Sequence, residues 1–286
     1  MTPLVQSRWL ALGAIALWTS LATLGVALSN LPPFWLTGIT LLIGSLVALP
    51  LSGFSLRQWR VPLPTLALGI YGLFGYHFLL FMALRHAPPV AANLINYLWP
   101  LGMVVLAPLL LPGARLRRQH LLGALLGFAG AALAITGGRW PDTALAWGYV
   151  PALGAALVWS SYSLLTQRVP AFPTSAIGLF AAVSGLLSLL CHAWLEAPVP
   201  LAQVLRGDVL WPLLLMGLGP LGAAFFLWDA ALKRGDARQI GLLSFSTPLL
   251  STLLLLLTRG ESPNASIALA TVLIVSAAWL GRARPE

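Results

Sequence analysis

The chain contains the same sequence pattern twice. Residues 83–101 (ALRHAPPVAANLINYLWPL) align without an insertion with residues 231–249 (ALKRGDARQIGLLSFSTPL), 148 positions later. Nearer the start of each half, residues 12–20 (LGAIALWTS) recur as residues 153–161 (LGAALVWSS), 141 positions later. Two matches at nearly the same spacing indicate that the chain is a duplicated unit.

Both copies are almost wholly apolar. Hydrophobic residues make up 59% of the chain and charged residues only 8%, whereas about 25% of the residues of a soluble domain are charged. The 286 residues suffice for ten membrane spans of about 20 residues each and leave no room for a water-soluble domain. The net charge of +9 comes from basic residues in the loops, so orientation in a membrane explains it better than nucleic-acid binding.

Prolines and charges divide the chain into ten apolar segments. The first begins after Arg8 and runs to Leu28, which is longer than the apolar region of a signal peptide, so we interpret it as a retained span. The predicted spans are residues 9–29, 33–51, 62–84, 89–111, 119–137, 145–166, 174–194, 208–231, 239–258 and 264–281.

The basic residues are distributed unequally between the two sides. With the N-terminus inside, the inner loops hold 12 Lys and Arg residues and the outer loops hold 4, which predicts that both termini are cytoplasmic. Five spans per repeat is an odd number, so the second repeat enters the membrane from the opposite face. The sequence therefore predicts an all-α integral membrane protein with two inverted five-helix repeats, residues 1–141 and 142–286, and a site near the midplane between them, as in many secondary transporters.

The chain carries no motif of a soluble enzyme. It has no Gly-rich phosphate-binding loop followed by Lys and Ser or Thr, and no spacing of His or Cys typical of a metal site. We therefore expect no catalytic residue, no metal, no cofactor and no ATPase subunit. Of the four histidines, only His77 lies deep in a predicted span, either as a buried structural residue or as a polar wall of a cavity.

Two prolines occupy equivalent positions in the repeats. Pro100 cannot bond the carbonyl of Asn96, and Pro248 cannot bond that of Ser244, because proline has no amide hydrogen. Unpaired carbonyls at membrane depth are tolerated only against protein or a water-filled cavity. We interpret both prolines as helix kinks beside a substrate cavity, to which Ser246 adds a hydroxyl; the alternative is a packing kink.

Three tryptophans lie deeper than the interfacial belt in which tryptophan is usual. Trp18 and Trp159 are equivalent in the two repeats, and Trp99 directly precedes a kink proline. We predict that they form an aromatic cavity, although packing alone explains any one of them. The predicted substrate-binding residues are Trp18, His77, Phe78, Asn96, Tyr97, Trp99, Trp159, Ser244 and Ser246.

Asp229 is the only carboxylate predicted to lie inside a span. Intramembrane carboxylates are costly and often mark ion paths. Lys233 follows four residues later, the favourable acid-before-base spacing on one helix face. We favour a structural ion pair over an energy-coupling site.

The fragments NYLWP at residues 96–100 and WDAALKRGD at residues 228–236, within five-helix repeats, resemble the drug/metabolite transporter superfamily with EamA-type repeats. More narrowly, they resemble aromatic amino-acid exporters of the YddG type. The resemblance implies ten spans in a bacterial inner membrane and export of aromatic and other neutral amino acids by alternating access. The alternatives are a broad exporter of drugs or metabolites, or an intramembrane enzyme or scaffold.

Overall fold

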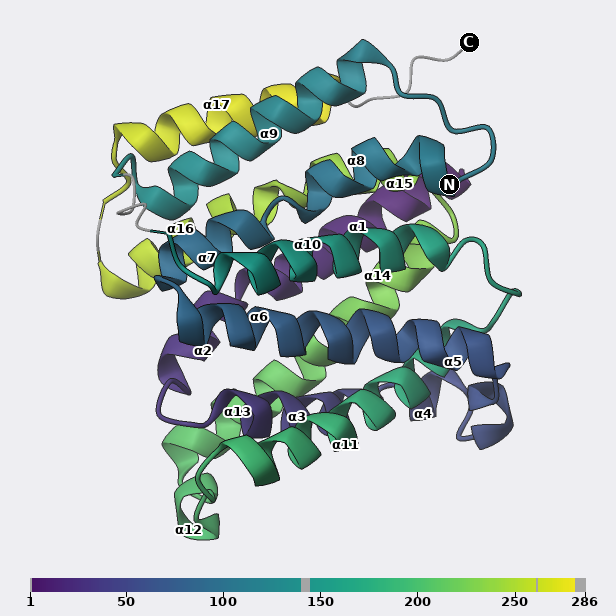
Figure 1. Cartoon of the computed structure of the whole chain (residues 1–286), viewed down its shortest axis with the longest axis vertical. Helices are drawn as coiled ribbons and strands as arrows, with labels where there is room; N and C mark the ends of the chain where they lie inside the picture. Colours follow the sequence, from purple (N-terminus) through teal and green to yellow (C-terminus); the bar gives the residue numbers. More distant parts are fainter. Residues whose placement is uncertain (1, 140–144, 261, 281–286) are drawn as a thin grey trace.

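The computed structural model of the chain describes residues 2–139, 145–260 and 262–280. All regular elements in these ranges are helices, and they lie side by side in one bundle (Figure 1). The predicted boundary between the repeats, at residues 141 and 142, lies outside the described residues and stays a prediction.

Each of the ten predicted segments contains helix. In chain order they are α1 (Pro3–Thr19) with α2 (Leu21–Ala27); α3 (Pro33–Ser45) with α4 (Ala48–Leu51); α5 (Leu63–Ile70), η2 (Tyr71–Gly75) and α6 (Tyr76–His86); α7 (Pro89–Asn96) with α8 (Trp99–Leu110); α9 (Arg118–Thr136); α10 (Tyr149–Leu165); η3 (Thr174–Ala176) with α11 (Ile177–Leu195); α13 (Gly207–Leu218), η4 (Gly219–Ala223) and α14 (Ala224–Leu232); α15 (Ala237–Ser244) with α16 (Ser246–Arg259); and α17 (Ala265–Leu280). The short helices η1 (Leu56–Trp59) and α12 (Leu201–Val204) lie in connections.

Among the described residues, eight helical segments are long and apolar enough to cross a membrane. The other two, α10 with 17 residues and α17 with 16, are apolar but shorter. Proline at the first helical turn begins α1, α3 and α7, where a missing amide hydrogen costs no hydrogen bond.

The two halves of the chain interleave. Helix α10 packs against α6, α7 and α8, while α1 packs against α14, α15 and α16. Helices α9 and α17 lie together at one edge of the bundle, and α3 and α11 lie together toward the other edge (Figure 1). The core is therefore built from both repeats.

The repeats share their irregularities as well as their helices. A π-helical turn interrupts the third segment at Tyr71–Gly75 and its equivalent at Gly219–Ala223, again 148 positions apart. The helix that follows each turn is continuous with it. Such turns are rare and occur mostly at functional sites, and both lie next to the candidate site described below.

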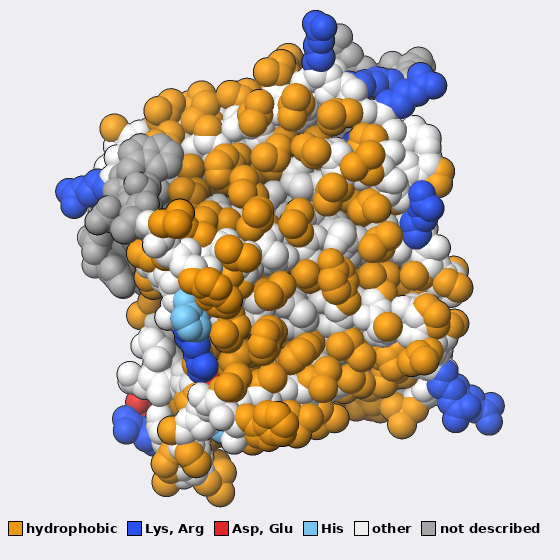
Figure 2. Space-filling model, viewed as in Figure 1, with side chains coloured by type: hydrophobic (Ala, Val, Ile, Leu, Met, Phe, Trp, Pro, Cys, Tyr) orange, Lys and Arg blue, Asp and Glu red, His pale blue; other side chains and the backbone are white. Residues whose placement is uncertain are grey.

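Apolar side chains cover the face of the bundle between its two ends (Figure 2). Leu109, Leu215 and Val272 are among the many exposed large apolar residues, and an exposed apolar surface of this extent indicates contact with lipid. This is a multi-pass membrane protein.

Lys and Arg side chains gather at the two ends (Figure 2). We call one of these the basic end, where α1 starts and α17 ends (Figure 1). The start of α1 and the connections at this end, as the course of the helices places them, contain Arg8, Arg57, Arg60, Arg115, Arg168, Lys233, Arg234 and Arg238. Its loops are tied together: Arg168 donates to the carbonyl of Leu110 at 2.6 Å, and Arg238 to that of Arg115 at 2.6 Å. The opposite end, with Arg85, Glu196 and Arg206, is called the Glu196 end.

Candidate substrate site

Three tryptophans predicted to lie at depth meet in the centre of the bundle. Trp18 of α1 and Trp159 of α10 make an edge-to-face contact with ring centroids 6.0 Å apart, and Trp99 of α8 lies 6.4 Å from Trp159. All three are buried. Aromatic pairs of this geometry are worth about 0.5–1.5 kcal/mol each beyond the area they bury.

A fourth tryptophan, Trp228 of α14, completes the group and was not predicted from the sequence. Its ring lies 5.1 Å from Trp18 and 5.6 Å from Trp99, and it stacks on Trp159 at 6.4 Å. We call Trp18, Trp99, Trp159 and Trp228 the tryptophan cluster. Its one signal in the sequence is depth: Trp228 precedes Lys233 by five residues, or about 7.5 Å along a helix.

Repeat-equivalent residues touch each other within the site. Trp18 contacts its equivalent Trp159, and His77 contacts its equivalent Phe225 with ring centroids 6.2 Å apart. Phe225 also lies 5.7 Å from Trp159 and 6.2 Å from Trp18. The site is therefore assembled where the two copies meet.

The helix interruptions fall at the predicted prolines, but with a different geometry. Helix α7 ends at Asn96 and α8 begins at Trp99, so Pro100 lies in the first turn of a new helix. Likewise α15 ends at Ser244 and α16 begins at Ser246, with Pro248 in its first turn. A proline in a first turn clashes with no preceding carbonyl, so each span is two helices rather than one kinked helix.

Several polar atoms of the first repeat are left for a ligand. Asn96 donates through Nδ2 to the Tyr76 hydroxyl at 3.1 Å, while its buried Oδ1 accepts no hydrogen bond from the described residues. The Nδ1 of His77 lies 2.6 Å from the carbonyl of Leu73, inside the first π-helical turn. A carbonyl only accepts, so Nδ1 carries the hydrogen, and Nε2 of the neutral ring is a free acceptor.

The four indole N–H groups divide into two kinds. Trp18 donates to the carbonyl of Pro220 in the second π-helical turn at 3.0 Å, and Trp228 donates to the Ser163 hydroxyl at 3.2 Å. Trp99 and Trp159 donate to no group among the described residues. The indoles of Trp18 and Trp228 are therefore held in place by hydrogen bonds, and those of Trp99 and Trp159 remain available as donors.

The two serines predicted in the second repeat use their hydroxyls internally. Ser244 donates to the carbonyl of Gly241 and Ser246 to that of Leu243, each at 2.6 Å. We predicted both as donors to a substrate, and in this structure both donate to backbone carbonyls of α15.

Two predicted residues lie outside the tryptophan cluster. Phe78 packs against Phe34 and Phe74, at 5.7 Å from each, and makes no ring contact with the four tryptophans. Tyr97 is half-buried beside the break after α7 and makes no ring contact within the described part of the chain. Tyr76 and Tyr162, which were not predicted, lie against Trp159 at 5.2 and 5.4 Å.

Comparison with known proteins decides the family. The EamA-like transporter family matches the chain twice, over residues 7–136 and 146–281. The chain belongs to this family. The resemblance inferred from the sequence is thereby confirmed, and this EamA-like protein is a transporter rather than an enzyme.

Individual relatives agree. The chain is 40% identical over 279 residues to the "Aromatic amino acid exporter YddG" of Ancylobacter novellus, covering 93% of each. It is 27% identical to a "Probable terminal-alkyne amino-acid exporter" of Streptantibioticus cattleyicolor, covering 78% of this chain and 76% of that protein. A solved structure described only as "Crystal structure of protein" superposes with a TM-score of 0.89 at 38% identity, over 97% of this chain and 96% of that one.

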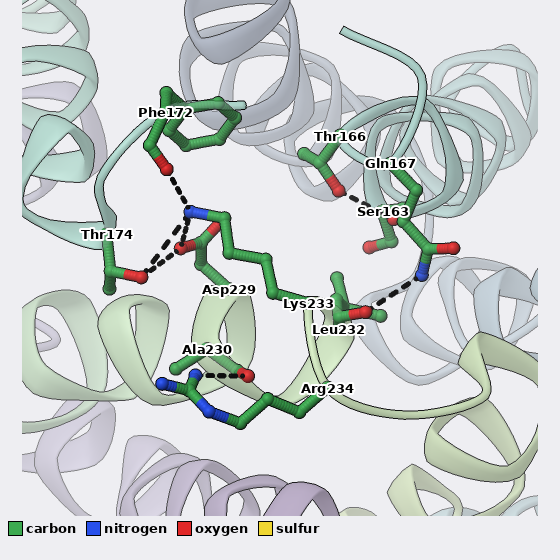
Figure 3. Close-up of polar contacts among 10 residues, drawn as sticks. All are labelled: Ser163, Thr166, Gln167, Phe172, Thr174, Asp229, Ala230, Leu232, Lys233 and Arg234. Carbon is green, nitrogen blue, oxygen red and sulfur yellow. Dashed lines mark hydrogen bonds and ion pairs between the residues drawn. The ribbon is translucent and has the colours of Figure 1, made fainter. Parts of the chain in front are cut away.

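The EamA-like transporter also holds a charged cluster around Asp229 and Lys233 (Figure 3), and Asp229 directly follows Trp228 in the sequence. The carboxylate Oδ2 of Asp229 lies 2.6 Å from Nζ of Lys233 and accepts from the Thr174 hydroxyl at 2.7 Å. Lys233 also donates to the carbonyl of Phe172 at 2.8 Å and lies 3.8 Å from the centre of its ring. Burial holds the pKa of Lys233 below its ordinary value, and the charge of Asp229 partly offsets this. The ion pair is present; its role stays a prediction.

No group of three or more potential metal ligands (His, Cys, Asp or Glu) occurs within residues 2–139, 145–260 and 262–280. The groups described at the candidate site provide hydrogen bonding and aromatic packing.

Proposed function

We propose that this transporter exports aromatic and other neutral amino acids across a bacterial inner membrane by alternating access around the tryptophan cluster. The observation that carries the proposal is the combination of a large aromatic wall with free polar atoms: Oδ1 of Asn96, Nε2 of His77, and the indole N–H groups of Trp99 and Trp159. The names of the relatives support the same substrate class.

An amino acid is a zwitterion, so a site in the membrane must solvate both charges. The free acceptors, on Asn96 and His77, suit the ammonium group. The free donors, on Trp99 and Trp159, suit the carboxylate. A flat apolar side chain then packs against the remaining rings, which favours phenylalanine and tryptophan over charged residues.

We further propose ten spans arranged as two inverted repeats, residues 1–141 and 142–286, with both termini in the cytoplasm. The basic end then faces the cytoplasm, as the positive-inside rule requires. In a chain with Cys191 replaced by Ser, Ala202→Cys and Ser262→Cys should react with an impermeant thiol reagent added outside, whereas Leu56→Cys and Leu116→Cys should not. The opposite labelling pattern would contradict both the orientation and the inversion.

Transport by purified protein in liposomes tests the substrate site. Trp159→Ala should raise the KM for phenylalanine and tryptophan up to about tenfold relative to that for threonine, because it removes ring packing that only large substrates use. The matched control is Trp211→Ala, since Trp211 is exposed, and it should change neither KM.

If Trp159→Ala and Trp99→Ala both keep the wild-type ratio of the KM for aromatic substrates to the KM for threonine, the tryptophans only pack the core. Transport of unrelated drugs without transport of amino acids by the wild-type protein would instead support the broad drug or metabolite exporter.

A further inference from the structure

One carboxylate oxygen of Asp229 has no hydrogen-bond partner among the described residues. Its Oδ2 is bonded by Lys233 and Thr174, but its Oδ1 is buried and accepts no hydrogen bond from the described residues. In that part of the chain, it is the only carboxylate oxygen that is both buried and without a partner. A buried unsatisfied acceptor is costly, and Oδ1 of Asp229 can accept a hydrogen bond from a ligand that reaches it.

Lys233 offers the opposite charge at the same place. Its ammonium group has three N–H donors: two are used at 2.6 and 2.8 Å, and the third faces Thr174 at 3.4 Å, which is long for a hydrogen bond. The Lys233 side chain is 27% exposed, whereas that of Asp229 is 3% exposed. The lysine can therefore turn its third donor toward an incoming acceptor without leaving Asp229.

The pair lies beside the tryptophan cluster. Trp228, which contacts the other three tryptophans, is the residue directly before Asp229. Ser163 of α10 accepts from Trp228. Gln167, two residues after the end of α10, donates to the carbonyl of Leu232 at 3.0 Å (Figure 3). A molecule moving from the basic end to the tryptophan cluster along α14 passes Lys233 first and Asp229 next.

We propose that Asp229 and Lys233 form a second binding site for a zwitterionic amino acid, at which the substrate is held before it reaches the tryptophan cluster. The substrate ammonium donates to the open Oδ1 of Asp229. The substrate carboxylate accepts from Nζ of Lys233 in place of the long Thr174 contact. The Phe172 ring provides an apolar wall. This inference rests on the proposed function.

The test uses inside-out membrane vesicles, which present the basic end to the medium under the proposed topology. Uptake of labelled L-phenylalanine is measured alone and in competition with L-phenylalaninamide, which lacks the carboxylate, and with 3-phenylpropionate, which lacks the ammonium group. Lys233→Met should raise the KM for phenylalanine and weaken inhibition by 3-phenylpropionate, each about tenfold, and leave inhibition by the amide unchanged. Asp229→Asn should raise the KM for phenylalanine by a similar factor. It should weaken inhibition by L-phenylalaninamide and leave inhibition by 3-phenylpropionate unchanged.

The control variant is Asp236→Asn. Asp236 is at the same end and is also paired, with Arg238, but both of its carboxylate oxygens are bonded. This variant should therefore change neither the KM for phenylalanine nor inhibition by the two analogues. Lys233→Arg keeps the positive charge and should retain inhibition by 3-phenylpropionate. This second variant keeps the test valid if Lys233→Met does not fold.

Equal losses for all three ligands in the Lys233 and Asp229 variants, or no loss in folded protein, would overturn the second site. Absence of phenylalanine uptake by the wild-type protein would instead contradict the proposed function.

Discussion

The two ends of the molecule each hold a buried carboxylate, and they hold it differently. Glu196 accepts four hydrogen bonds: from the amides of Phe34 and Trp35 at 3.0 and 3.1 Å, from Arg85 at 2.6 Å and from His192 at 3.0 Å. Asp229 accepts two, and both reach the same oxygen. One carboxylate is fully bonded, and the other is half bonded.

The partners differ in their origin as well. Glu196 follows α11, in the second repeat, and binds the start of α3 and the end of α6, in the first, so it joins the repeats. It also caps the first turn of α3, where free amides and the helix dipole favour a negative charge. Asp229, Lys233 and Thr174 all belong to the second repeat. The comparison indicates a clamp at the Glu196 end and a pair open to a ligand at the basic end.

The substitution expected to have the largest effect is Glu196→Gln, which tests whether Glu196 holds the two repeats together. It leaves Arg85 without its carboxylate and weakens the cap of α3, so we expect the free energy of unfolding to fall by about 3 kcal/mol. Thermal melting of the purified protein in detergent measures the loss. Asp208→Asn is the control, because Asp208 pairs with Arg206 on the surface of the same end, and it should not change the melting temperature. A wild-type melting curve for Glu196→Gln would refute the clamp.

Asp229→Asn should destabilise the protein less, by about 1–2 kcal/mol, because Lys233 keeps its bond to the carbonyl of Phe172. If the pair is structural and carries no coupling proton, the shape of the pH profile of transport should match that of the wild type. A profile that becomes flat in well-folded Asp229→Asn protein would show that Asp229 couples transport to protons.

The smallest effect is expected at Asp236, which caps α15. Burial by itself raises the pKa of Asp236, but hydrogen bonds and charge from Arg238 outweigh this and hold the pKa below its ordinary value. A lowered pKa stabilises the fold above the ordinary carboxyl pKa of about 4, and the stabilisation is lost as the pH falls through the folded-state value. Asp236→Asn should therefore melt slightly below the wild type at pH 7, and the difference should shrink in acid. A constant difference from pH 7 into strong acid would contradict this.

The sequence predicted the helices well because each signal was local. Each apolar segment predicted from the prolines and charges contains helix in the described part of the chain, and the 148-residue spacing locates both breaks near Pro100 and Pro248. The separate 141-residue spacing identifies Trp18 and Trp159 as equivalent, and the structure shows these two rings in contact.

The sequence did not predict Trp228, Tyr76 or the open oxygen of Asp229, and it misplaced Phe78 relative to the tryptophan cluster. These depend on how α14 and α6 are rotated against α1 and α10, and both helices follow a π-helical turn that changes the rotation by an extra residue. Nor can spacing along one helix indicate which of two carboxylate oxygens finds a partner.

The sequence by itself determined a duplicated, apolar, all-helical chain with an acid and a base one turn apart, because periodicity and composition act along the chain. Only the tertiary structure decided that Oδ1 of Asn96 keeps no partner and that Ser244 and Ser246 use their hydroxyls internally. It also decided that Glu196 is fully bonded and Asp229 is not. Hydrogen-bond partners are chosen by packing between distant segments, and that choice is made only when the helices meet.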